Sequence, residues 1–316
     1  MVSIFTVDAF TETPFSGNPA GVCIVPRADD DSNNNGKWSL SDKQMQNIAT
    51  EMNISETSFI TFHERTLTNV WELRWMTPTV EVNLCGHGTL SAAAIIFQEY
   101  GDKVGNSILF HTLSGILIAE KNLNTGKIKM TLPNNPPVIV SNPSAIHKQI
   151  FQCMNFNMDD FQELAYSMTT KKLLICLNNF NRTKLEALKP NIDGLTQIDQ
   201  TNEIASGNNV KGVIITFKID TTNNQQDDDD NTSIKYDFLS RYFAPWVGIP
   251  EDPVTGSAHT VLTPYWSTKF NGQKNFVARQ CSKRGGDLSL TLNDNDNKVY
   301  VSGHACVVMS GKLNIV

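Results

Sequence analysis

The chain has 316 residues, 40% of them hydrophobic and 18% charged, which is usual for a globular protein of about two domains. Its net charge of -6 offers no basic face for nucleic acid. No apolar stretch is long enough to span a bilayer, and the first residues lack the features of a signal peptide. The six cysteines are scattered without a Cys-x-x-Cys pair. We therefore expect a cytoplasmic protein with reduced thiols that binds neither nucleic acid nor a membrane.

The first half predicts strands and helices in alternation. Strands are expected over residues 4–10, 21–25, 58–62 and 72–76. Between the second and third of these, Ser41 predicts the N-cap of a helix whose apolar residues recur along one stripe. The turn Gly-His-Gly-Thr at residues 86–89 then leads into a helix that is apolar nearly all round, so we expect it to be buried.

The second half repeats this plan. A strand is expected over residues 213–219, and Arg-Tyr-Phe-Ala-Pro then precedes a turn, Thr-Gly-Ser-Ala, that opens another apolar helix. In the first half, Arg-Trp-Met-Thr-Pro precedes the first turn in the same order. This ordered similarity predicts a duplicated unit. Pro264 lies inside the second helix and is expected to kink or shorten it.

Two segments are polar, charged and low in complexity, at residues 29–36 and 221–233. Neither can bury enough apolar surface to offset the entropy of ordering, so both are expected to be mobile surface loops. The four consecutive aspartates in the second segment favour a solvated acidic loop over a cation site.

The two Gly-rich turns are candidates for an anion site. A helix N-terminus presents unpaired backbone N–H groups and partial positive charge, and Gly and Ser let an anion approach closely. The simpler alternative is that both are well-capped core helices. Reactive side chains lie within a few residues of the two helix starts: Cys85, His87, Asp252, Ser257 and His259.

Glu56 lies between a predicted helix and an apolar strand, in the segment Asn-Ile-Ser-Glu-Thr-Ser-Phe. Flanked by Ile54 and Phe59, its carboxyl is expected to be partly desolvated, with its pKa raised toward the range in which it can both give and take a proton. Taken alone, a capping or surface carboxylate is the simpler interpretation.

The motifs FTVDAF, SGNPAGVC, NISETSF, RWMTP, CGHGTLSAAA, RYFAPWVG, EDPVTGSAH and QCSKRGG occur in this order. Together they resemble the PhzF family of phenazine-biosynthesis-like isomerases, and within it the eukaryotic phenazine biosynthesis-like domain proteins, also called MAWD-binding proteins. The resemblance implies an α+β, diaminopimelate-epimerase-like fold of two pseudo-symmetric lobes, each a β-sheet wrapped around a central α-helix. The lobes are expected at residues 1–133 with the C-terminal strand 304–316, and at 134–303, with the active site in the cleft between them.

The resemblance also implies the site. Glu56 matches the proton donor and acceptor, while His87, Asp252 and Ser257 match residues that surround the substrate. Substrate contacts are further implied for a set of Gly and polar residues: Asn18, Gly86, Gly88, Gly256, Gln280, Ser282 and Arg284. No metal and no cofactor is expected, because the sequence shows no P-loop, Gly-x-Gly-x-x-Gly motif or metal-ligand spacing.

Three functional hypotheses follow. The first is a cofactor-independent isomerase that moves a proton within a small carboxylate substrate by way of Glu56. The second is an epimerase or racemase that pairs Cys85 with Asp252, which we place where related racemases carry their second cysteine. The third is a non-catalytic module that binds a WD-repeat protein, and a homodimer is the other partner considered. Presence of the full catalytic set favours the isomerase.

Overall fold

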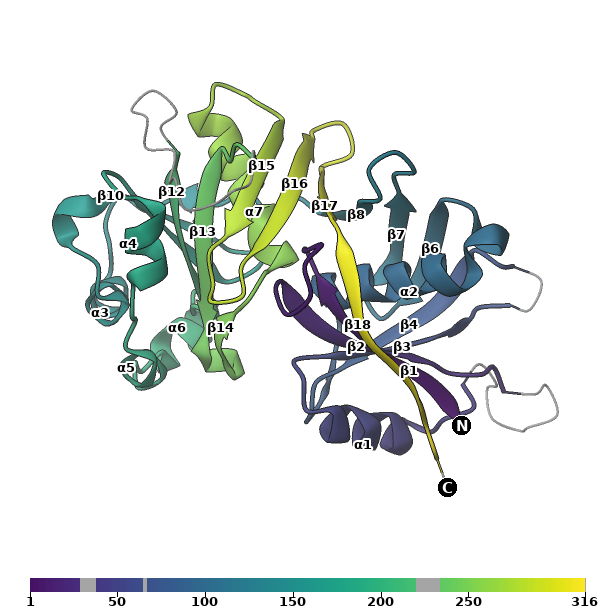
Figure 1. The fold of residues 1–316 in the computed structure, drawn as a ribbon. Helices are drawn as coiled ribbons and strands as arrows, with labels where there is room; N and C mark the ends of the chain where they lie inside the picture. Colours follow the sequence, from purple (N-terminus) through teal and green to yellow (C-terminus); the bar gives the residue numbers. More distant parts are fainter. Residues whose placement is uncertain (29–37, 65–66, 220–233, 316) are drawn as a thin grey trace. The chain divides into compact units, whose positions relative to one another are not determined.

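The computed structural model describes residues 1–28, 38–64, 67–219 and 234–315, so the segments 29–36 and 221–233, predicted to be mobile loops, lie outside the described residues. The chain divides into two compact units (Figure 1). The first comprises Met1–Leu132 and Tyr300–Val316, and the second comprises Pro133–Val299. The sequence analysis expects these boundaries after residues 133 and 303.

The described residues of the first unit form a mixed sheet with two helices. Strand β1 lies between β2 and β18 and is antiparallel to both, while β2 runs parallel to β3. Strand β4 is antiparallel to β3 and parallel to β6, and β7 continues the sheet next to β6. The elements are β1 (Val2–Ala9), β2 (Asn18–Ile24), α1 (Asp42–Met52), β3 (Thr57–Phe62), β4 (Val70–Met76), β5 (Glu81–Val82), α2 (Gly86–Val104), β6 (Ser107–Thr112), β7 (Gly115–Lys121), β8 (Ile128–Pro133) and β18 (Ala305–Leu313).

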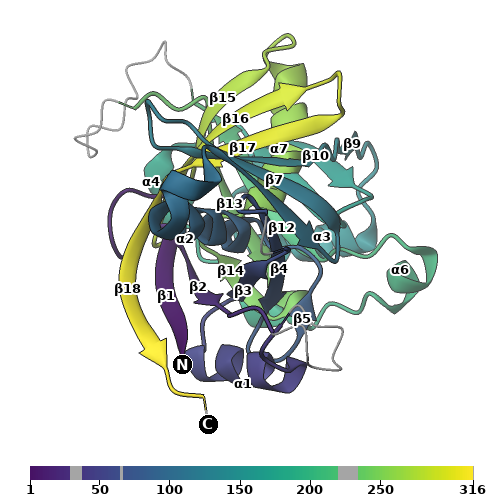
Figure 2. The ribbon, with the colours of Figure 1, turned by 90° about the vertical axis from the view of Figure 1, so that its right-hand side faces the viewer.

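Helix α2 forms the centre of this unit. It contacts β1, β2, β3, β6, β7 and β18, and Figure 2 shows it beside β1 and β18. Its first turns are buried almost completely, as expected for a helix that is apolar nearly all round. Helix α1 packs on another part of the sheet, where Met45 and Ala49 contact Phe59. Ser41 caps α1 through a capping box with Gln44, as the sequence predicts.

The second unit repeats the strand pairing of the first. Its antiparallel pairs are β10–β11, β12–β13, β13–β14 and β15–β16, and its parallel pairs are β11–β12 and β13–β15. The first unit has the matching antiparallel pairs β1–β2, β3–β4, β4–β5 and β6–β7, and the matching parallel pairs β2–β3 and β4–β6, in the same order along the chain. The predicted internal repeat is therefore present in the strand topology.

The two units differ in the connection before the third strand of the repeat. Among the described residues, one helix, α1, lies between β2 and β3, whereas three short helices lie between β11 and β12. The elements of the second unit are β9 (Val138–Ile139), α3 (Ala145–Met154), η1 (Met158–Asp160), β10 (Phe161–Ser167), β11 (Lys172–Leu177), α4 (Arg182–Ala187), α5 (Ile192–Thr196), α6 (Thr201–Ser206), β12 (Gly212–Lys218), β13 (Phe238–Ala244), η2 (Pro245–Val247), β14 (Ile249–Asp252), α7 (Gly256–Lys269), β15 (Asn275–Gln280) and β16 (Gly286–Asn293). Strand β17 (Lys298–Gly303) crosses the boundary between the units.

Helix α7 is the buried helix of the second unit and the counterpart of α2. It has 14 residues against 19 in α2, and it continues past Pro264 to Lys269. Since a proline has no N–H, the carbonyl of Thr260 loses its partner within the helix. That carbonyl instead accepts the backbone N–H of Asn135 at 3.2 Å, and the Asn135 side chain donates to Thr260 Oγ1 at 2.9 Å. A neighbouring loop thus replaces the missing helical hydrogen bond.

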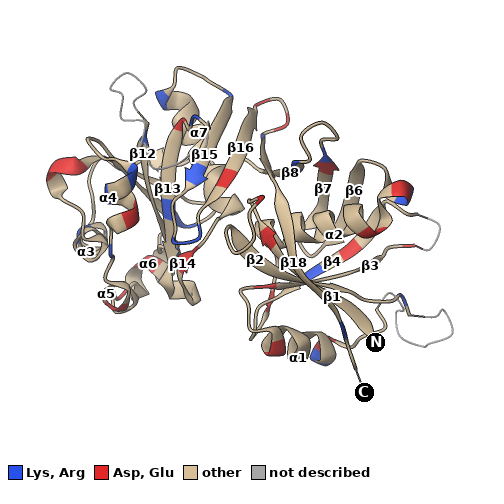
Figure 3. Cartoon of the chain, in the orientation of Figure 1, with Lys and Arg blue, Asp and Glu red and all other residues tan. Residues whose placement is uncertain are grey.

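The distribution of charged residues and the state of the cysteines agree with the composition. Figure 3 shows acidic and basic residues interspersed along the elements of each unit. All six cysteines lie within the described residues and carry free thiols. Among the described helices, none combines the length and the apolar character that a bilayer crossing requires.

Candidate functional site

The first helix start is closely packed. Cys85 is the N-cap of α2, and its Sγ accepts the N–H of Gly88 at 3.3 Å. A Cβ on Gly88 would lie 2.8 Å from Cδ1 of Trp75 and 2.9 Å from Oγ of Ser58. Only glycine fits there without displacing a neighbour. The Gly88 amide, predicted to contact substrate, is thus engaged in capping the helix.

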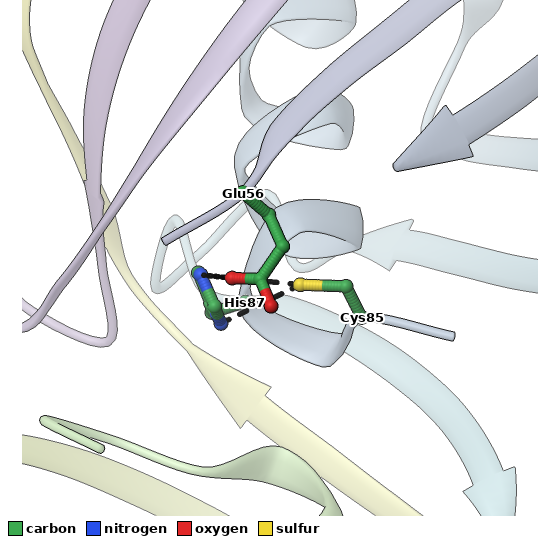
Figure 4. Close-up of side chains that lie close together, drawn as sticks. All are labelled: Glu56, Cys85 and His87. Atoms are coloured by element: carbon green, nitrogen blue, oxygen red, sulfur yellow. Dashed lines mark hydrogen bonds and ion pairs between the residues drawn. The ribbon is translucent and has the colours of Figure 1, made fainter. Parts of the chain in front are cut away.

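His87 occupies the second position of α2 and gathers polar side chains from two other segments. Its Nε2 lies 3.1 Å from Oε2 of Glu56 and 3.2 Å from Oγ of Ser55, both just before β3. Its Nδ1 lies 3.2 Å from the Asn18 side-chain amide at the start of β2, and 3.6 Å from Sγ of Cys85. Figure 4 shows the carboxylate, imidazole and thiol of this group facing one another. Sheet pairing brings these distant segments together.

The carboxyl and the imidazole form a buried ion pair. Desolvation is the largest influence on the pKa of Glu56 and would raise it, but the charge of His87 and hydrogen bonds from His87, Ser55 and Cys85 lower the pKa overall. Desolvation alone would lower the pKa of His87, whereas the charges of Cys85 and Glu56 and the hydrogen bonds with both side chains raise it well above its usual value. Burial, together with the charge of Glu56, raises the pKa of the Cys85 thiol, and His87 acts in the opposite direction.

The expected direction of the Glu56 pKa is therefore wrong. The sequence neighbours Ile54 and Phe59 suggest a raised pKa, but His87, which follows far along the chain, outweighs them. Protonation of both His87 nitrogens requires the side-chain amide of Asn18 to turn so that its oxygen faces Nδ1, which exchanges the positions of Oδ1 and Nδ2. The resting state is a carboxylate ready to accept a proton.

The same three side chains are also zinc-ligand types. One ligand atom each from Glu56, Cys85 and His87 lies within 4.8 Å of the others. All three residues are buried, and the thiol must lose its proton before it can bind a metal. The group is therefore suited to proton transfer in its resting charge state and to metal binding only after deprotonation.

The second helix start is held by Gln280. This side chain is completely buried; its oxygen accepts the N–H of Thr255 at 2.8 Å, and its amino group donates to the carbonyl of Asp252 at 2.6 Å. Thr255 Oγ1 donates to the carboxylate of Asp252. Gln280 thus fixes the turn that places Asp252, and direct substrate contact by Gln280 remains a prediction.

The other predicted residues of the second unit lie around this turn. Gly256 is buried at the first position of α7, and Ser257 is half-buried at the second, the register that His87 has in α2. Ser282 Oγ donates to the carbonyl of Pro253 at 2.8 Å and accepts the N–H of Gly285 at 3.1 Å. Arg284 is half-buried in the same loop. Their roles toward substrate stay predictions.

Comparison of the two helix starts corrects one assignment. The sequence analysis places Asp252 where the second thiol of a racemase would be. Thr255, however, is the N-cap of α7, as Cys85 is of α2. The glutamate four residues before each N-cap, Glu81 or Glu251, binds an arginine through both carboxylate oxygens. The register is therefore the same in both units, and Thr255 is the counterpart of Cys85.

Sequence reasoning missed a buried lysine whose charge interacts with that of Asp252. Lys172 is 7% exposed, and its Nζ lies 5.5 Å from the ring centre of Tyr242, which pairs with Asp252 across β13 and β14. Burial lowers the pKa of Lys172 to about 8, while the charge of Asp252 acts in the opposite direction. Lys172 lies within residues 142–209, a segment that contains none of the family motifs, so no sequence signal points to it.

The structure thus assembles two groups, one in each unit. The first contains Asn18, Glu56, Cys85 and His87. The second contains Asp252, Thr255, Gln280 and the start of α7. Convergence of Glu56 and His87 with Asp252 and Ser257 on one substrate remains a prediction.

Three comparisons with known proteins indicate the same family. The family model described as phenazine biosynthesis-like protein, PhzC-PhzF, matches residues 7–311. A phenazine biosynthesis-like domain-containing protein of Bos taurus is 40% identical, over 98% of each chain. An uncharacterized isomerase of Halalkalibacterium halodurans is 36% identical, over 98% of this chain and 97% of the relative. The crystal structure of a PhzF family protein from Enterococcus faecalis is 29% identical, covers 99% of each chain and has a TM-score of 0.77.

A more distant likeness concerns the fold alone. The probable proline racemase of Agrobacterium radiobacter is 10% identical and covers 100% of this chain and 94% of its own, with a TM-score of 0.56. Together with the repeated strand pairing, this likeness confirms the predicted α+β, diaminopimelate-epimerase-like fold of two pseudo-symmetric lobes.

Proposed function

Because the chain belongs to the phenazine biosynthesis-like (PhzC-PhzF) family, we propose that it is an isomerase that moves a proton within a small carboxylate substrate, with Glu56 as the general acid and base. The supporting observation is the buried pair of Glu56 with His87 at the start of α2. A C–H next to a carboxylate or a conjugated enamine is weakly acidic. Its removal requires a base within reach and a site that stabilises the charge that develops.

In the proposed reaction the Glu56 carboxylate takes the proton from one carbon of the substrate. Its lowered pKa keeps it ionised at neutral pH, and His87 holds it in place at 3.1 Å. The protonated imidazole also adds positive charge beside the N-terminus of α2, which suits an anionic substrate. Return of the proton from Glu56 to a different carbon of the conjugated system completes the isomerisation.

The remaining roles are assigned by the family resemblance. We assign Asp252 and Ser257 to orienting the substrate, and the backbone of Gly86 and Gly256 to binding its carboxylate. No step of this proposal requires a cofactor. Binding of a WD-repeat protein and formation of a homodimer remain predictions.

Cys85 is the basis of the alternative, an epimerase. Its buried thiol has a raised pKa and caps α2 through the Gly88 N–H, which favours a structural role. Its counterpart Thr255 carries a hydroxyl, which is a far weaker acid and base than a thiol near neutral pH. These features support Glu56 over Cys85 as the proton carrier.

The test is exchange of solvent deuterium into small carboxylic acids from a metabolite library. Glu56→Gln should lower turnover and exchange by about 10²–10⁴-fold, because the amide keeps the shape but cannot carry a proton. Glu51→Gln, on the exposed side of α1, is the matched control and should leave both rates unchanged. Cys85→Ala should retain exchange. An inactive Cys85→Ala with an active Glu56→Gln would favour the epimerase, and full exchange in both variants would exclude either residue as the carrier.

A further inference from the structure

A second group of metal-ligating side chains lies in the first unit, away from the start of α2. One ligand atom each from His63, Glu72 and His111 lies within 4.8 Å of the others. His63 follows the last residue of β3 directly, Glu72 lies in the middle of β4, and His111 lies near the end of β6. They are widely separated in sequence, so no ligand-spacing motif reveals them.

The sheet register brings these side chains to one face. Thr61 pairs with Glu72, and the N–H of His63 donates to the carbonyl of Val70, so His63 continues the same antiparallel ladder. Glu72 pairs directly with His111 in the parallel pair β4–β6. Because side chains alternate along a strand, these pairings put His63, Glu72 and His111 on the same side. Trp71 and Phe110, their chain neighbours, are buried on the opposite side.

Contacts already link His63 to the other two side chains of this group. Nδ1 of His63 hydrogen-bonds to Oε1 of Glu72, and the rings of His63 and His111 stack with centres 4.1 Å apart. The side chains of His63 and Glu72 are 20% and 14% exposed, so they are reachable from solvent yet partly shielded from it. Glu64 supplies a further carboxylate, 3.9 Å from Nε2 of His63. Two imidazoles and one or two carboxylates form a ligand set typical of zinc.

We propose that His63, Glu72 and His111 bind a zinc ion on the first unit, with Glu64 or water as the fourth ligand. Ligand atoms around tetrahedral zinc are about 3.4 Å apart, so the group has to contract slightly. A metal lies in the plane of each imidazole that binds it. One of the two stacked rings therefore has to rotate when the ion enters.

The surrounding charge is compatible with a cation. Arg27 donates to the backbone carbonyls of Phe62 and His63 and adds one positive charge nearby. The carboxylates of Glu64 and Glu72 offset it. The simpler alternative is an ion pair of protonated His63 with Glu72, without a metal. The experiment separates these two states.

The test is titration of the full chain with Zn²⁺ by calorimetry, with Co²⁺ absorption as a probe of four-coordinate geometry. We expect one ion bound in the wild type. His111→Gln and Glu72→Gln should each weaken that binding by more than about 100-fold, since even partners outside the ligand set cost about 10–100-fold. Thermal unfolding of the metal-free variants checks that each is folded, and either variant suffices if the other is not.

The group around Glu56 provides the control, because it is the other potential metal cluster among the described residues. Cys85→Ser should leave zinc binding unchanged if His63, Glu72 and His111 hold the ion. The proposal is overturned if the wild type binds no zinc, if His111→Gln and Glu72→Gln bind it as tightly as the wild type, or if Cys85→Ser alone abolishes binding. His304→Gln, outside both groups, controls for weak binding by histidine in general.

Discussion

Helices α2 and α7 begin in the same way, yet the side chains around their first turns differ in charge. At the start of α2 a carboxylate and a protonated imidazole are paired and buried. At the start of α7 the buried imidazole is His259, which hydrogen-bonds to the Thr255 carbonyl at 2.8 Å and whose pKa burial lowers to about 4. One helix start therefore carries a charged histidine and the other a neutral one.

The strand register shows where the second carboxylate is missing. Arg74 pairs with Phe59 on β3, and Arg241 pairs with Ile215 on β12. By the same count Glu56 falls at the register of Gly212. A Cβ on Gly212 would lie 2.2 Å from the hydroxyl of Tyr242, so the tyrosine covers that position. The duplicated scaffold thus has one place for a carboxylate at the register of Glu56, which supports the proposed one-base chemistry over a symmetric pair.

An arginine hydrogen-bonds to the glutamate that precedes each turn, and replacing this arginine should have the largest effect on the free energy of unfolding. Arg241 binds Glu251 and also donates to the carbonyls of Leu185 and Leu188, with its side chain 8% exposed. Arg241→Met should therefore lower the free energy of unfolding by about 3–5 kcal/mol, because the Glu251 carboxylate and two carbonyls lose a buried charged donor.

Arg74→Met is the matched comparison in the first unit. The Arg74 side chain is 19% exposed, and one of its partners, Asp42, is 82% exposed, so the loss should be about 1 kcal/mol. Urea unfolding followed by circular dichroism measures both values. Equal losses in the free energy of unfolding would contradict the difference in burial between Arg241 and Arg74 that the structure indicates.

A smaller effect is expected at the third position of each helix. Gly88→Ala should lower the free energy of unfolding by about 1–3 kcal/mol, because the added methyl meets Trp75 and Ser58. Ala258 holds the same register in α7, and Ala258→Gly should cost about 1 kcal/mol through helix propensity. A neutral Gly88→Ala would mean that the turn has room to relax.

The smallest effects are the titrations of the two buried histidines, followed by nuclear magnetic resonance. His87 should stay protonated above its ordinary pKa, and His259 should stay neutral down to about pH 4. The contribution of His87 to stability is full below about pH 6.5 and is lost as pH rises through its raised pKa. That of His259 is full above about pH 6.5 and is lost as pH falls toward 4. Glu56→Gln should lower the pKa of His87 and leave that of His259 unchanged.

Local patterns in the sequence predicted much of the fold. Ser41 marks the start of α1, and the two Gly-rich turns mark the starts of α2 and α7. By contrast, residues 142–209 give no motif, so strands β10 and β11 and the short helices after them could not be assigned. Periodicity is a weak guide there, because β11 is buried along its whole length and does not alternate.

The sequence predicted which residues form the site, but it did not predict the charge that they carry. Family motifs point to Glu56 and His87, yet the direction of the Glu56 pKa depends on a contact made only after folding. The role of Gln280 also depends on long-range hydrogen bonds, since its carboxamide reaches Thr255 from the end of β15. Sequence neighbours describe the solvent environment of a residue poorly when its closest partners lie on other strands.

The pairing of β1 with β18 has a consequence for the order in which the chain folds during synthesis. Val2 pairs with Leu313, so β1 waits for a strand that follows the whole second unit in the chain. The second unit is one continuous segment, and all of it is synthesised before β18. Until β18 emerges, β1 has an open edge beside the strand that carries Asn18. The unit with the proposed proton carrier is therefore the later one to mature, and its exposed edge is where a nascent chain is most prone to pair with another.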